Sequence, residues 1–371
     1  MRILVIGPTG SGGSIPPYLN VLTAGLRQHG AHVDRLGSPT LPYDSTTSTF
    51  WPADRIIAAA HQLLTDVDLS SYDVLSLHFG NLEIEQLLPT LWGQRNLPPV
   101  VYHVHSLDWT LFTHHVPNPE LRAAVDTAIE RMNGFLAFGE YGRRRITHQH
   151  NQTAPSTVSW LPTTIPTTTP PQPPAPRPGP GLLASLYGYA APWKDAGTLL
   201  NACANVSTAF RMVLAGPFWD DQTQAGIDLT RECATGAQHG RGHVDVTARY
   251  LDPGARKALA ECTDIATFPY RSHSSFQGSG AIADYLAHGV PILATDVANM
   301  TELIGDAGHI VEPDSAAAFA DGLDRLLTDH HYRNTLRRNA ERRRTQFSSS
   351  HHAATCLRLY ETVTTRTATT S

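Results

Sequence analysis

A glycine-serine turn followed by a carboxylate is the segment whose residue types most directly suggest chemistry. Gly278, Ser279 and Gly280 carry little or no side chain, so backbone N–H groups could approach an anion closely where a helix begins. Asp284 stands one turn further on, where its carboxylate could accept hydrogen bonds from a sugar hydroxyl. The segment could therefore bind a nucleotide sugar, although ordinary strand–helix–strand units contain glycine-rich turns as well.

Two cations of the second half could stabilise a departing diphosphate. Lys194, one of only two lysines, stands in a loop before an expected helix, and Arg271 follows an apolar strand. Ligands of open α/β sheets bind at the carboxyl ends of the strands. We therefore expect Lys194, Arg271 and the turn 278–280 to share one rim. A solvated loop lysine is the competing interpretation of Lys194.

The glycine-rich loop GPTGSGGS at 7–14 comes close to the phosphate-binding P-loop pattern, but Gly13 stands where that pattern has its lysine. Without that cation the loop cannot neutralise β- and γ-phosphates in the usual way. A P-loop nucleotide hydrolase is therefore only a rival interpretation. We prefer a turn over which a diphosphate or sugar could lie, and a plain turn between strand and helix is an equal alternative.

A group of histidines with one aspartate invites a metal interpretation. The group consists of His103, His105, His114, His115 and Asp108. A strand places His103 and His105 on the same face, so chelation is geometrically possible. No cysteine or glutamate cluster accompanies them. We therefore expect no metal site, and core or substrate-contacting roles instead.

Alternating strand and helix patterns must position these residues. Strands are expected in the first half at 2–6, 32–36, 73–78, 99–105 and 134–138, and in the second half at 182–188, 212–215, 265–269, 291–295 and 309–311. Helical patterns separate them, as at 16–29, 54–64, 119–132, 194–204, 254–261, 281–287, 316–328 and 331–346. This alternation predicts an α/β protein with a parallel, doubly wound sheet in each half.

Two domains are expected because 371 residues exceed one typical core. We assign 1–165 to the first domain, 166–181 to a proline-rich linker and 182–348 to the second. The apolar positions of 351–362 need a surface to cover, for which the first domain is the candidate, so 349–371 is assigned to it as a returning helix and tail. The terminal TTRTATTS is expected to be disordered.

Composition narrows the class of protein. No apolar run is long enough for a transmembrane helix, and the N-terminus enters a strand without a signal-peptide pattern. Four widely spaced cysteines indicate reduced thiols and a cytoplasmic location. A net charge of −5 argues against nucleic-acid binding. The preference for arginine over lysine, with abundant alanine and proline, is typical of a GC-rich bacterial genome.

Taken together, these segments resemble the retaining group-one (family 4) glycosyltransferases of the GT-B fold, which has two Rossmann-like domains facing each other across a cleft. The resemblance covers nearly the whole chain. The segments that carry it are HVHSLD (103–108), AFGEYGRRRI (137–146), SWLPTTIP (159–166), YGYAAPWKDAGTLLNA (187–202), RMVLAGPF (211–218) and GSGAIADYLAHGVPILATD (278–296).

The resemblance implies roles for individual residues. Gly12 and Gly13 would flank the donor phosphate, and His105 would approach the donor sugar. Lys194, in a loop that starts at Gly188, would bind the diphosphate. Asp284 would stand where the family has the second glutamate of its Glu-(seven residues)-Glu motif, which holds the ribose.

The chain also departs from the family pattern. The first glutamate of that motif falls on Phe276, with Gln277 beside it. The arginine that normally accompanies the lysine falls on Tyr189 or Ala191, neither of which is cationic, and Arg271 is a candidate replacement.

The resemblance implies transfer of a hexose or N-acetylhexosamine from a UDP-sugar to a small hydroxylated acceptor, with retention of configuration. We expect no metal and no cofactor, the UDP-sugar being a co-substrate. Arg249 and Tyr250 are expected to contribute to the nucleotide site. The acceptor would bind near Tyr18, His78, Asp108 and Trp109.

Several alternatives stay open. An aminocyclitol or another secondary metabolite, as in antibiotic biosynthesis, is the favoured acceptor class, because no strongly basic amphipathic helix that would dock on a membrane is evident in the first half. A lipid or polysaccharide acceptor is the alternative, as is a non-catalytic homologue that binds a partner enzyme. We expect no stable membrane insertion and keep a homodimer open.

Overall fold

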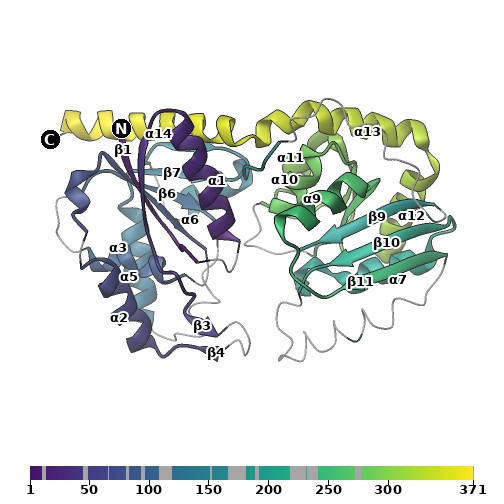
Figure 1. Ribbon diagram of the computed structural model, residues 1–371, viewed down its shortest axis with the longest axis horizontal. Helices are drawn as coiled ribbons and strands as arrows, with labels where there is room; N and C mark the ends of the chain where they lie inside the picture. The colour runs from purple at the N-terminus through teal and green to yellow at the C-terminus, as the bar shows by residue number, and fades with distance from the viewer. Residues whose placement is uncertain are drawn as a thin grey trace. The chain divides into compact units, whose positions relative to one another are not determined.

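The chain forms two compact units in the computed structural model (Figure 1). Unit 1 comprises Met1–Pro162, Ser274–Gly278 and Ser348–Ser371, and unit 2 comprises Thr163–His273 and Ser279–Phe347. The structure describes residues 1–10, 14–44, 49–65, 67–80, 83–92, 97–107, 119–150, 153–165, 181–188, 192–217, 231, 241–271 and 278–370. The linker expected at 166–181 lies, except for Gly181, outside these residues.

Unit 1 is built on a six-stranded parallel sheet in the order β2-β1-β5-β6-β7-β8. Its strands are β1 (Arg2–Ile6), β2 (His32–Leu36), β5 (Val74–Phe79), β6 (Val100–Val104), β7 (Gly134–Ala137) and β8 (Ser156–Val158). The central strands are buried along their whole length, because helices cover both faces of the sheet. A short antiparallel pair, β3 (Tyr43–Asp44) with β4 (Thr49–Phe50), stands apart from it.

Two apolar clusters hold the helices of unit 1 against the sheet. One cluster joins the sheet to α1 (Ile15–Gln28) and to the last helix, α14 (Ser349–Thr370). The other joins it to α2 (Ala53–Leu63), η2 (Ile84–Leu87), α3 (Leu88–Leu91) and α5 (Pro119–Glu130). The remaining helices of this unit are η1 (Leu69–Ser71) and α6 (Glu140–Gln149). The two faces of the sheet are thus covered by different sets of helices.

The last helix packs on unit 1, where α14 lies beside α1 (Figure 1). It continues to Thr370, so the expectation of a disordered tail from 364 onward was wrong. Packing accounts for the helix, since Tyr360 and Val363 lie in the apolar cluster of unit 1. The threonine hydroxyls bond to carbonyls one turn back, Thr364 to Tyr360 and Thr367 to Val363. Each β-branched residue thereby keeps its hydroxyl paired inside the helix.

Unit 2 repeats the design with a parallel sheet in the order β11-β10-β9-β12-β13-β14. Its strands are β9 (Leu182–Tyr187), β10 (Phe210–Ala215), β11 (Gly242–Thr247), β12 (Ile265–Phe268), β13 (Ile292–Thr295) and β14 (Gly308–Val311). The sequence analysis missed β11. This strand lies at the sheet edge, and its alternating GHVDVT pattern buries only part of its length.

The helices of unit 2 follow the strands in the expected alternation. They are η3 (Pro192–Lys194), α7 (Ala196–Asn205), α9 (Pro253–Cys262), α10 (Gly280–Ala287), α11 (Met300–Ile304), η4 (Gly305–Ala307), α12 (Ala316–Thr328), α13 (His330–Arg343) and η5 (Arg344–Phe347). Side chains of Asp195, Asp252, Ser279, Ser315 and Asp329 accept N–H groups at helix starts. These caps fix where the helices begin, and two of them adjoin the candidate site.

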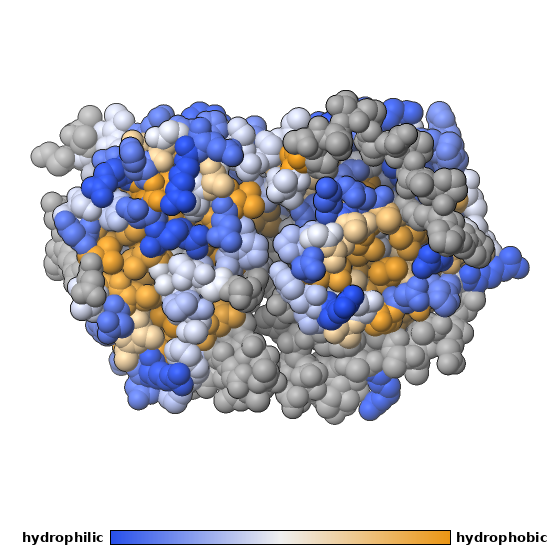
Figure 2. Space-filling model, viewed as in Figure 1, coloured by the Kyte–Doolittle hydropathy of each residue, from blue (hydrophilic) through white to orange (hydrophobic). Residues whose placement is uncertain are grey.

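The surface of the described residues offers few large apolar side chains. Met1 and Tyr250 are the only large hydrophobic residues there that are well exposed. Figure 2 shows apolar residues in each unit bordered by hydrophilic ones on the visible face. Within the described residues, no helix combines the length and the apolar character that a membrane span requires.

Candidate active site

The order of strands in unit 2 defines where a ligand would bind. From β9 the chain moves to β10 and β11 on one side, and it then returns to β12 on the other side. The carboxyl ends of β9 and β12 therefore flank the point where the strand order reverses, which is the usual ligand crevice of an open α/β sheet. Gly188 follows β9, while Tyr270 and Arg271 follow β12.

Gly188 makes room for the ammonium group of Lys194. The φ angle of Gly188 is +124°, which side-chain-bearing residues rarely adopt, and a Cβ atom there would lie 2.6 Å from Lys194 Nζ. The ammonium group therefore sits directly over the glycine backbone. A side chain at position 188 would push Nζ away from the end of β9.

The Lys194 ammonium is a desolvated cation. Burial lowers the pKa of Lys194 to about 8, and no charged neighbour contributes to that shift. Its Nζ lies 5.9 Å from the centroid of the Tyr270 ring. Within the described part of the chain, no carboxylate forms an ion pair with Lys194. The Lys194 side chain keeps intermediate exposure, so an anion could approach the ammonium and would stabilise it.

Arg271, in contrast, is already paired. Its Nε and Nη2 atoms each lie 2.8 Å from an oxygen of Asp195, which forms a bidentate ion pair. The Asp195 side chain is 2% exposed and that of Arg271 54% exposed. Asp195 also accepts hydrogen bonds from the backbone N–H and hydroxyl of Thr198 at the start of α7. The expected contact of Arg271 with the diphosphate stays a prediction, and in this structure its guanidinium is engaged by Asp195.

Tyr270 connects the lysine to the serine-glycine turn. Its ring faces Lys194, and its hydroxyl is hydrogen-bonded to the side chain of Ser279. Ser279 caps α10, and its Oγ accepts the N–H of Ile282 at 3.3 Å. A Cβ atom on Gly280 would meet no atom within 4 Å, so space is open beside the first turn of α10. Lys194 and the start of α10 thus share one rim.

The third residue of the expected turn, Gly278, directly precedes Ser279 in the chain. Gly278 belongs to unit 1, where a Cβ atom on it would lie 3.1 Å from Leu161 and 3.5 Å from Phe138. The expected contact of Gly278 with the diphosphate stays a prediction.

Asp284 is occupied by protein hydroxyls. Its two carboxylate oxygens accept hydrogen bonds from Thr163 and Tyr187, and Nη1 of Arg256 lies 3.8 Å from one of them. In this structure the carboxylate therefore ties the end of β9 to α10. A ribose hydroxyl would have to replace one of these partners.

Arg249 and Tyr250 lie beyond the edge strand of the sheet. They follow β11, which is separated from β9 by β10, and the Tyr250 side chain is exposed. Among the described residues, the structure shows no contact between this pair and Lys194. The expected nucleotide contacts from Arg249 and Tyr250 stay a prediction.

At the corresponding edge of unit 1, four of the sequence-selected residues come together. His78 lies on β5, its register partner His103 lies on β6, and His105 follows β6. His78 Nδ1 lies 3.2 Å from His105 Nε2, and the Tyr18 hydroxyl on α1 lies 2.9 Å from His103 Nδ1. Tyr18 and His105 also form an edge-on ring contact, with centroids 4.7 Å apart.

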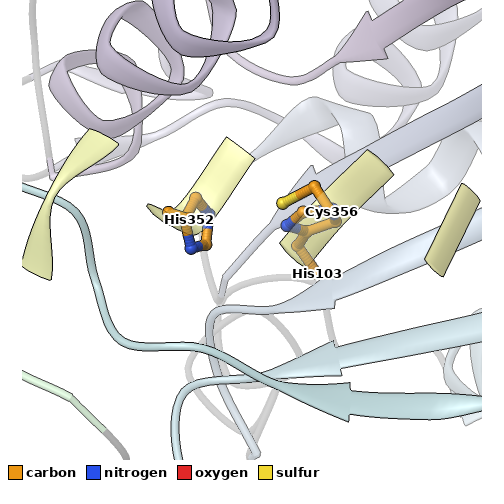
Figure 3. A group of neighbouring side chains, drawn as sticks. All are labelled: His103, His352 and Cys356. Atoms are coloured by element: carbon orange, nitrogen blue, oxygen red, sulfur yellow. The ribbon is translucent and has the colours of Figure 1, made fainter. Parts of the chain in front are cut away.

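A possible metal-ligand cluster lies behind these residues. The nitrogen and sulfur atoms of His103, His352 and Cys356 lie within 4.8 Å of one another, and Figure 3 shows the latter two on the same helix. The Tyr18 hydroxyl, however, bonds His103 Nδ1 and lies 2.8 Å from His352 Nε2. Both ring nitrogens are therefore satisfied by a protein hydroxyl, and a hydrogen-bond network accounts for the cluster.

Comparisons with known proteins agree with this geometry. Residues 182–329 match the family model described as glycosyl transferases group 1, and these residues contain the Lys194 rim. The second half of the chain is a group 1 glycosyltransferase domain. The resemblance inferred from the sequence is thereby confirmed over these residues. A search of curated proteins finds no significant match.

Solved structures share the fold of the whole chain. Sucrose-phosphate synthase from Thermosynechococcus elongatus is 15% identical with a TM-score of 0.75, and 98% of each chain is covered. Anabaena HepE in complex with UDP-glucose is 14% identical with a TM-score of 0.67, and 100% of each chain is covered. AviGT4, a glycosyltransferase involved in avilamycin A biosynthesis, is 16% identical with a TM-score of 0.61 over 98% of each chain. The glycosyltransferase therefore has the GT-B fold.

Several sequence-selected residues of the glycosyltransferase lie outside the described part of the chain. They are Gly12, Gly13, Asp108, Trp109, His114, His115, Tyr189, Ala191, Phe276 and Gln277. Their expected roles stay predictions.

The sequence analysis missed two carboxylates of the glycosyltransferase. Asp195 was passed over, although an aspartate directly before a helix is a frequent N-cap. Glu85 on η2 is fully buried beside the ends of β1 and β2, where its Oε1 accepts the Ser38 N–H at 2.5 Å. Burial raises the pKa of Glu85 to about 7, and no hydrogen-bond partner of its Oε2 occurs among the described residues. No sequence pattern marks this position.

Proposed function

We propose that this glycosyltransferase transfers a hexose or N-acetylhexosamine from a UDP-sugar to a small hydroxylated acceptor, with retention of configuration. One observation carries the proposal. The Lys194 ammonium lacks a carboxylate partner among the described residues. It faces the ring of Tyr270, whose hydroxyl is bonded to Ser279, the residue that caps α10. A point charge beside a helix start is a suitable site for a diphosphate.

The diphosphate is proposed to bind between Lys194 and the first turn of α10. The first N–H groups of a helix have no intrahelical acceptor, and the space beside Gly280 is open. As the glycosidic bond to the diphosphate breaks, negative charge develops on the phosphate oxygens. One well-placed donor in such a site contributes about 3–4 kcal/mol to the transition state.

Arg271 is proposed to act together with Asp195. Their ion pair is neutral overall, and the Arg271 N–H also donates to the Trp193 carbonyl at 2.8 Å. Both contacts hold the loop that carries Lys194 against the end of β12. The positive charge toward the diphosphate would then come mainly from Lys194, while Arg271 fixes its position.

The nature of the donor is supported by the structural relatives. HepE was solved with UDP-glucose, and a trehalose-6-phosphate protein from E. coli was solved with UDP-2-fluoro glucose. The second relative has a TM-score of 0.67 and 13% identity, and 97% of this chain and 99% of that chain are covered. We extend the UDP-sugar from these proteins to the present chain.

The acceptor is proposed to be a small molecule of the aminocyclitol or secondary-metabolite class. AviGT4, which shares the fold, is involved in the biosynthesis of avilamycin A. The sequence-selected acceptor residues Tyr18 and His78 lie at the carboxyl edge of the unit 1 sheet beside His105. His78 is fully buried and Tyr18 nearly so, so the partly exposed His105 is the side chain of this group that an acceptor could reach.

The direct test is turnover with a panel of UDP-sugars, scored as hydrolysis or as transfer to aminocyclitols. Product NMR would report the anomeric configuration, and retention is expected. The other lysine provides a matched control, since Lys257 is exposed on α9 and pairs with Glu261 at 3.7 Å. Activity lost in Lys194→Ala and kept in Lys257→Ala supports the proposal. Absence of turnover with every UDP-sugar would favour a non-catalytic homologue, and turnover only with lipid or polysaccharide acceptors would overturn the acceptor class.

A further inference from the structure

A buried carboxyl group holds one of two neighbouring loops in unit 1. The loops are residues 7–10, which follow β1, and residues 37–39, which follow β2, and we call them the paired loops. Glu85 on η2 is fully buried, and its Oε1 atom accepts the Ser38 N–H at 2.5 Å. Since β2 has already ended at Leu36, Glu85 supplies the acceptor that this buried N–H needs.

The segment that Glu85 holds is bonded in turn to the loop after β1. The Ser38 carbonyl accepts the Thr9 N–H at 2.8 Å. The Gly37 carbonyl accepts the Thr9 hydroxyl at 3.2 Å. Glu85 is thereby connected to the first loop through a single residue, Ser38.

Close glycine contacts pack the paired loops against each other. A Cβ atom on Gly37 would lie 1.8 Å from the carbonyl oxygen of Gly7. A Cβ atom on Gly10 would lie 2.2 Å from the carbonyl oxygen of Pro39. Because neither distance leaves room for a side chain, a displacement of one loop requires a displacement of the other.

The paired loops border the residues that the sequence analysis selected for the acceptor. A Cβ atom on Gly7 would lie 3.0 Å from Cβ and from the carbonyl oxygen of His78, and 2.7 Å from Leu19 on α1. The same helix carries Tyr18, and His78 Nδ1 lies 3.2 Å from Nε2 of the partly exposed His105. A displaced loop after β1 would therefore also displace this edge of the unit 1 sheet.

The bond to Ser38 distinguishes Glu85 from its neighbour on η2. The Oε2 atom of Glu85 has no hydrogen-bond partner among the described residues. Gln86 is buried as well, and neither atom of its amide has a partner in the described part of the chain. Two adjacent buried polar side chains thus differ in whether they hold the paired loops.

We propose that Glu85 is a positioning residue for the transfer reaction: by accepting the Ser38 N–H it fixes the paired loops, and through them the edge of the sheet beside His78. Glu85 itself is buried and acts through the loops. The effect on turnover rests on the proposed function, whereas the fixing of the loops does not. The role requires an acceptor oxygen, which glutamine keeps and leucine lacks.

Amide hydrogen exchange without substrate tests whether Glu85 fixes the loops. Glu85→Leu should speed the exchange of the Ser38 and Thr9 N–H groups at least about tenfold relative to the amides of β6, which report global stability. Glu85→Gln should exchange like the wild type. Gln86→Leu is the matched control and should also exchange like the wild type. Unchanged protection of Thr9 in folded Glu85→Leu would overturn the inference.

Thr9→Val tests the same connection at an exposed residue, and it decides the matter if Glu85→Leu does not fold. The change removes the hydroxyl that donates to the Gly37 carbonyl. The Thr9 and Ser38 N–H groups should exchange faster than in the wild type. Thr65→Val, an exposed change outside the paired loops, should leave their exchange unaltered. Equal protection in Thr9→Val and the wild type would show that the loops are not held together, which overturns the inference.

Kinetics separate positioning from donor binding. Glu85→Leu should lower kcat/KM for transfer at least about tenfold, because small displacements of a substrate-positioning edge are costly. The affinity for UDP should fall by less, because Lys194 lies in unit 2 and keeps its place. Glu85→Gln should restore most of the lost activity, and Gln86→Leu should retain wild-type kinetics.

Three kinetic results would overturn the positioning role. They are a wild-type kcat/KM in Glu85→Leu, an equal loss in Glu85→Gln, and a loss of UDP affinity as large as the loss of kcat/KM. The absence of turnover in the wild type would count against the proposed function instead. Hydrogen exchange would then still decide whether Glu85 fixes the paired loops.

Discussion

Both units are built on a six-stranded parallel sheet, but they treat polar groups at the carboxyl edges of these sheets in opposite ways. In unit 2, Lys194 is desolvated and lacks a carboxylate partner among the described residues. In unit 1, histidines, tyrosines and serines satisfy one another over a long buried path. An ion left without a counter-ion indicates a place for a charged ligand, whereas a satisfied network indicates that a side chain is being held in position.

The largest effect is expected when the Lys194 ammonium is removed. Lys194→Ala should lower kcat/KM by roughly 10²–10³-fold, because it removes the charge opposite the leaving diphosphate. Steady-state kinetics with the best UDP-sugar would measure the loss. Lys257→Ala should retain wild-type kinetics, and a wild-type rate in Lys194→Ala would show that the ammonium is not used.

Glu85 of unit 1 differs from this network, because one of its buried oxygens has no hydrogen-bond partner in the part of the chain that the structure describes. Its folded pKa of about 7 lies above the ordinary value of 4.5, so the folded protein keeps a proton that the unfolded chain loses between these pH values. The free energy of unfolding should therefore fall by about 3 kcal/mol as pH rises through this window, and this contribution should be constant above it.

Urea unfolding at several pH values would measure this slope. Glu85→Gln should remove it, because the amide cannot ionise. Glu120→Gln, an exposed change on α5, should leave it intact. A slope that persists unchanged in Glu85→Gln would assign it to another group.

A substitution at Gly188 tests how close the Lys194 ammonium must lie to the end of β9. Gly188→Ala places a Cβ atom 2.6 Å from Lys194 Nζ at a φ of +124°. The strained backbone should cost about 1–3 kcal/mol of stability, and the displaced ammonium should weaken UDP binding. Thermal unfolding and UDP titration would measure the two effects.

Gly30 provides the matched control, because it has a φ of +84° and a Cβ atom there would meet nothing within 4 Å. Gly30→Ala should share the stability loss and keep wild-type UDP affinity. If both variants bound UDP like the wild type, the close approach of Lys194 to Gly188 would have no part in binding.

The smallest effect is expected in the pH dependence of kcat/KM, as a decline at high pH. Because the pKa of Lys194 is about 8, the free enzyme loses its ammonium charge above that pH, and kcat/KM should fall there. Lys194→Arg keeps the charge to much higher pH, so its lower activity should not show this decline. An identical decline in both proteins would assign the titration to a different residue.

The sequence was sufficient to predict the common rim of Lys194 and the serine-glycine turn. Parallel strands place their carboxyl ends on one edge, and each residue follows or adjoins such an end. It was not sufficient for the pairing of Arg271 with Asp195, because that contact depends on which strands become neighbours. The edge strand β11 was missed, since its short alternating pattern is weak.

The buried network of histidines and tyrosines in unit 1 shows a different reason for failure. Histidines on β5 and β6 were recognised, but His352 and Tyr360 come from α14, more than two hundred residues later in the chain. Their proximity depends on how α14 packs against the sheet. A local pattern cannot reveal a hydrogen bond between such distant segments, and the same holds for the buried Glu85, whose partner Ser38 lies 47 residues earlier in the chain.

The central claim is that Lys194 and the start of α10 bind a diphosphate, and calorimetric titration of UDP and uridine tests it most directly. Wild-type protein should bind UDP more tightly than uridine, and Lys194→Ala should abolish most of that difference while leaving uridine affinity unchanged. Equal affinities for UDP and uridine in the wild type, or an undiminished preference for UDP in Lys194→Ala, would contradict the account.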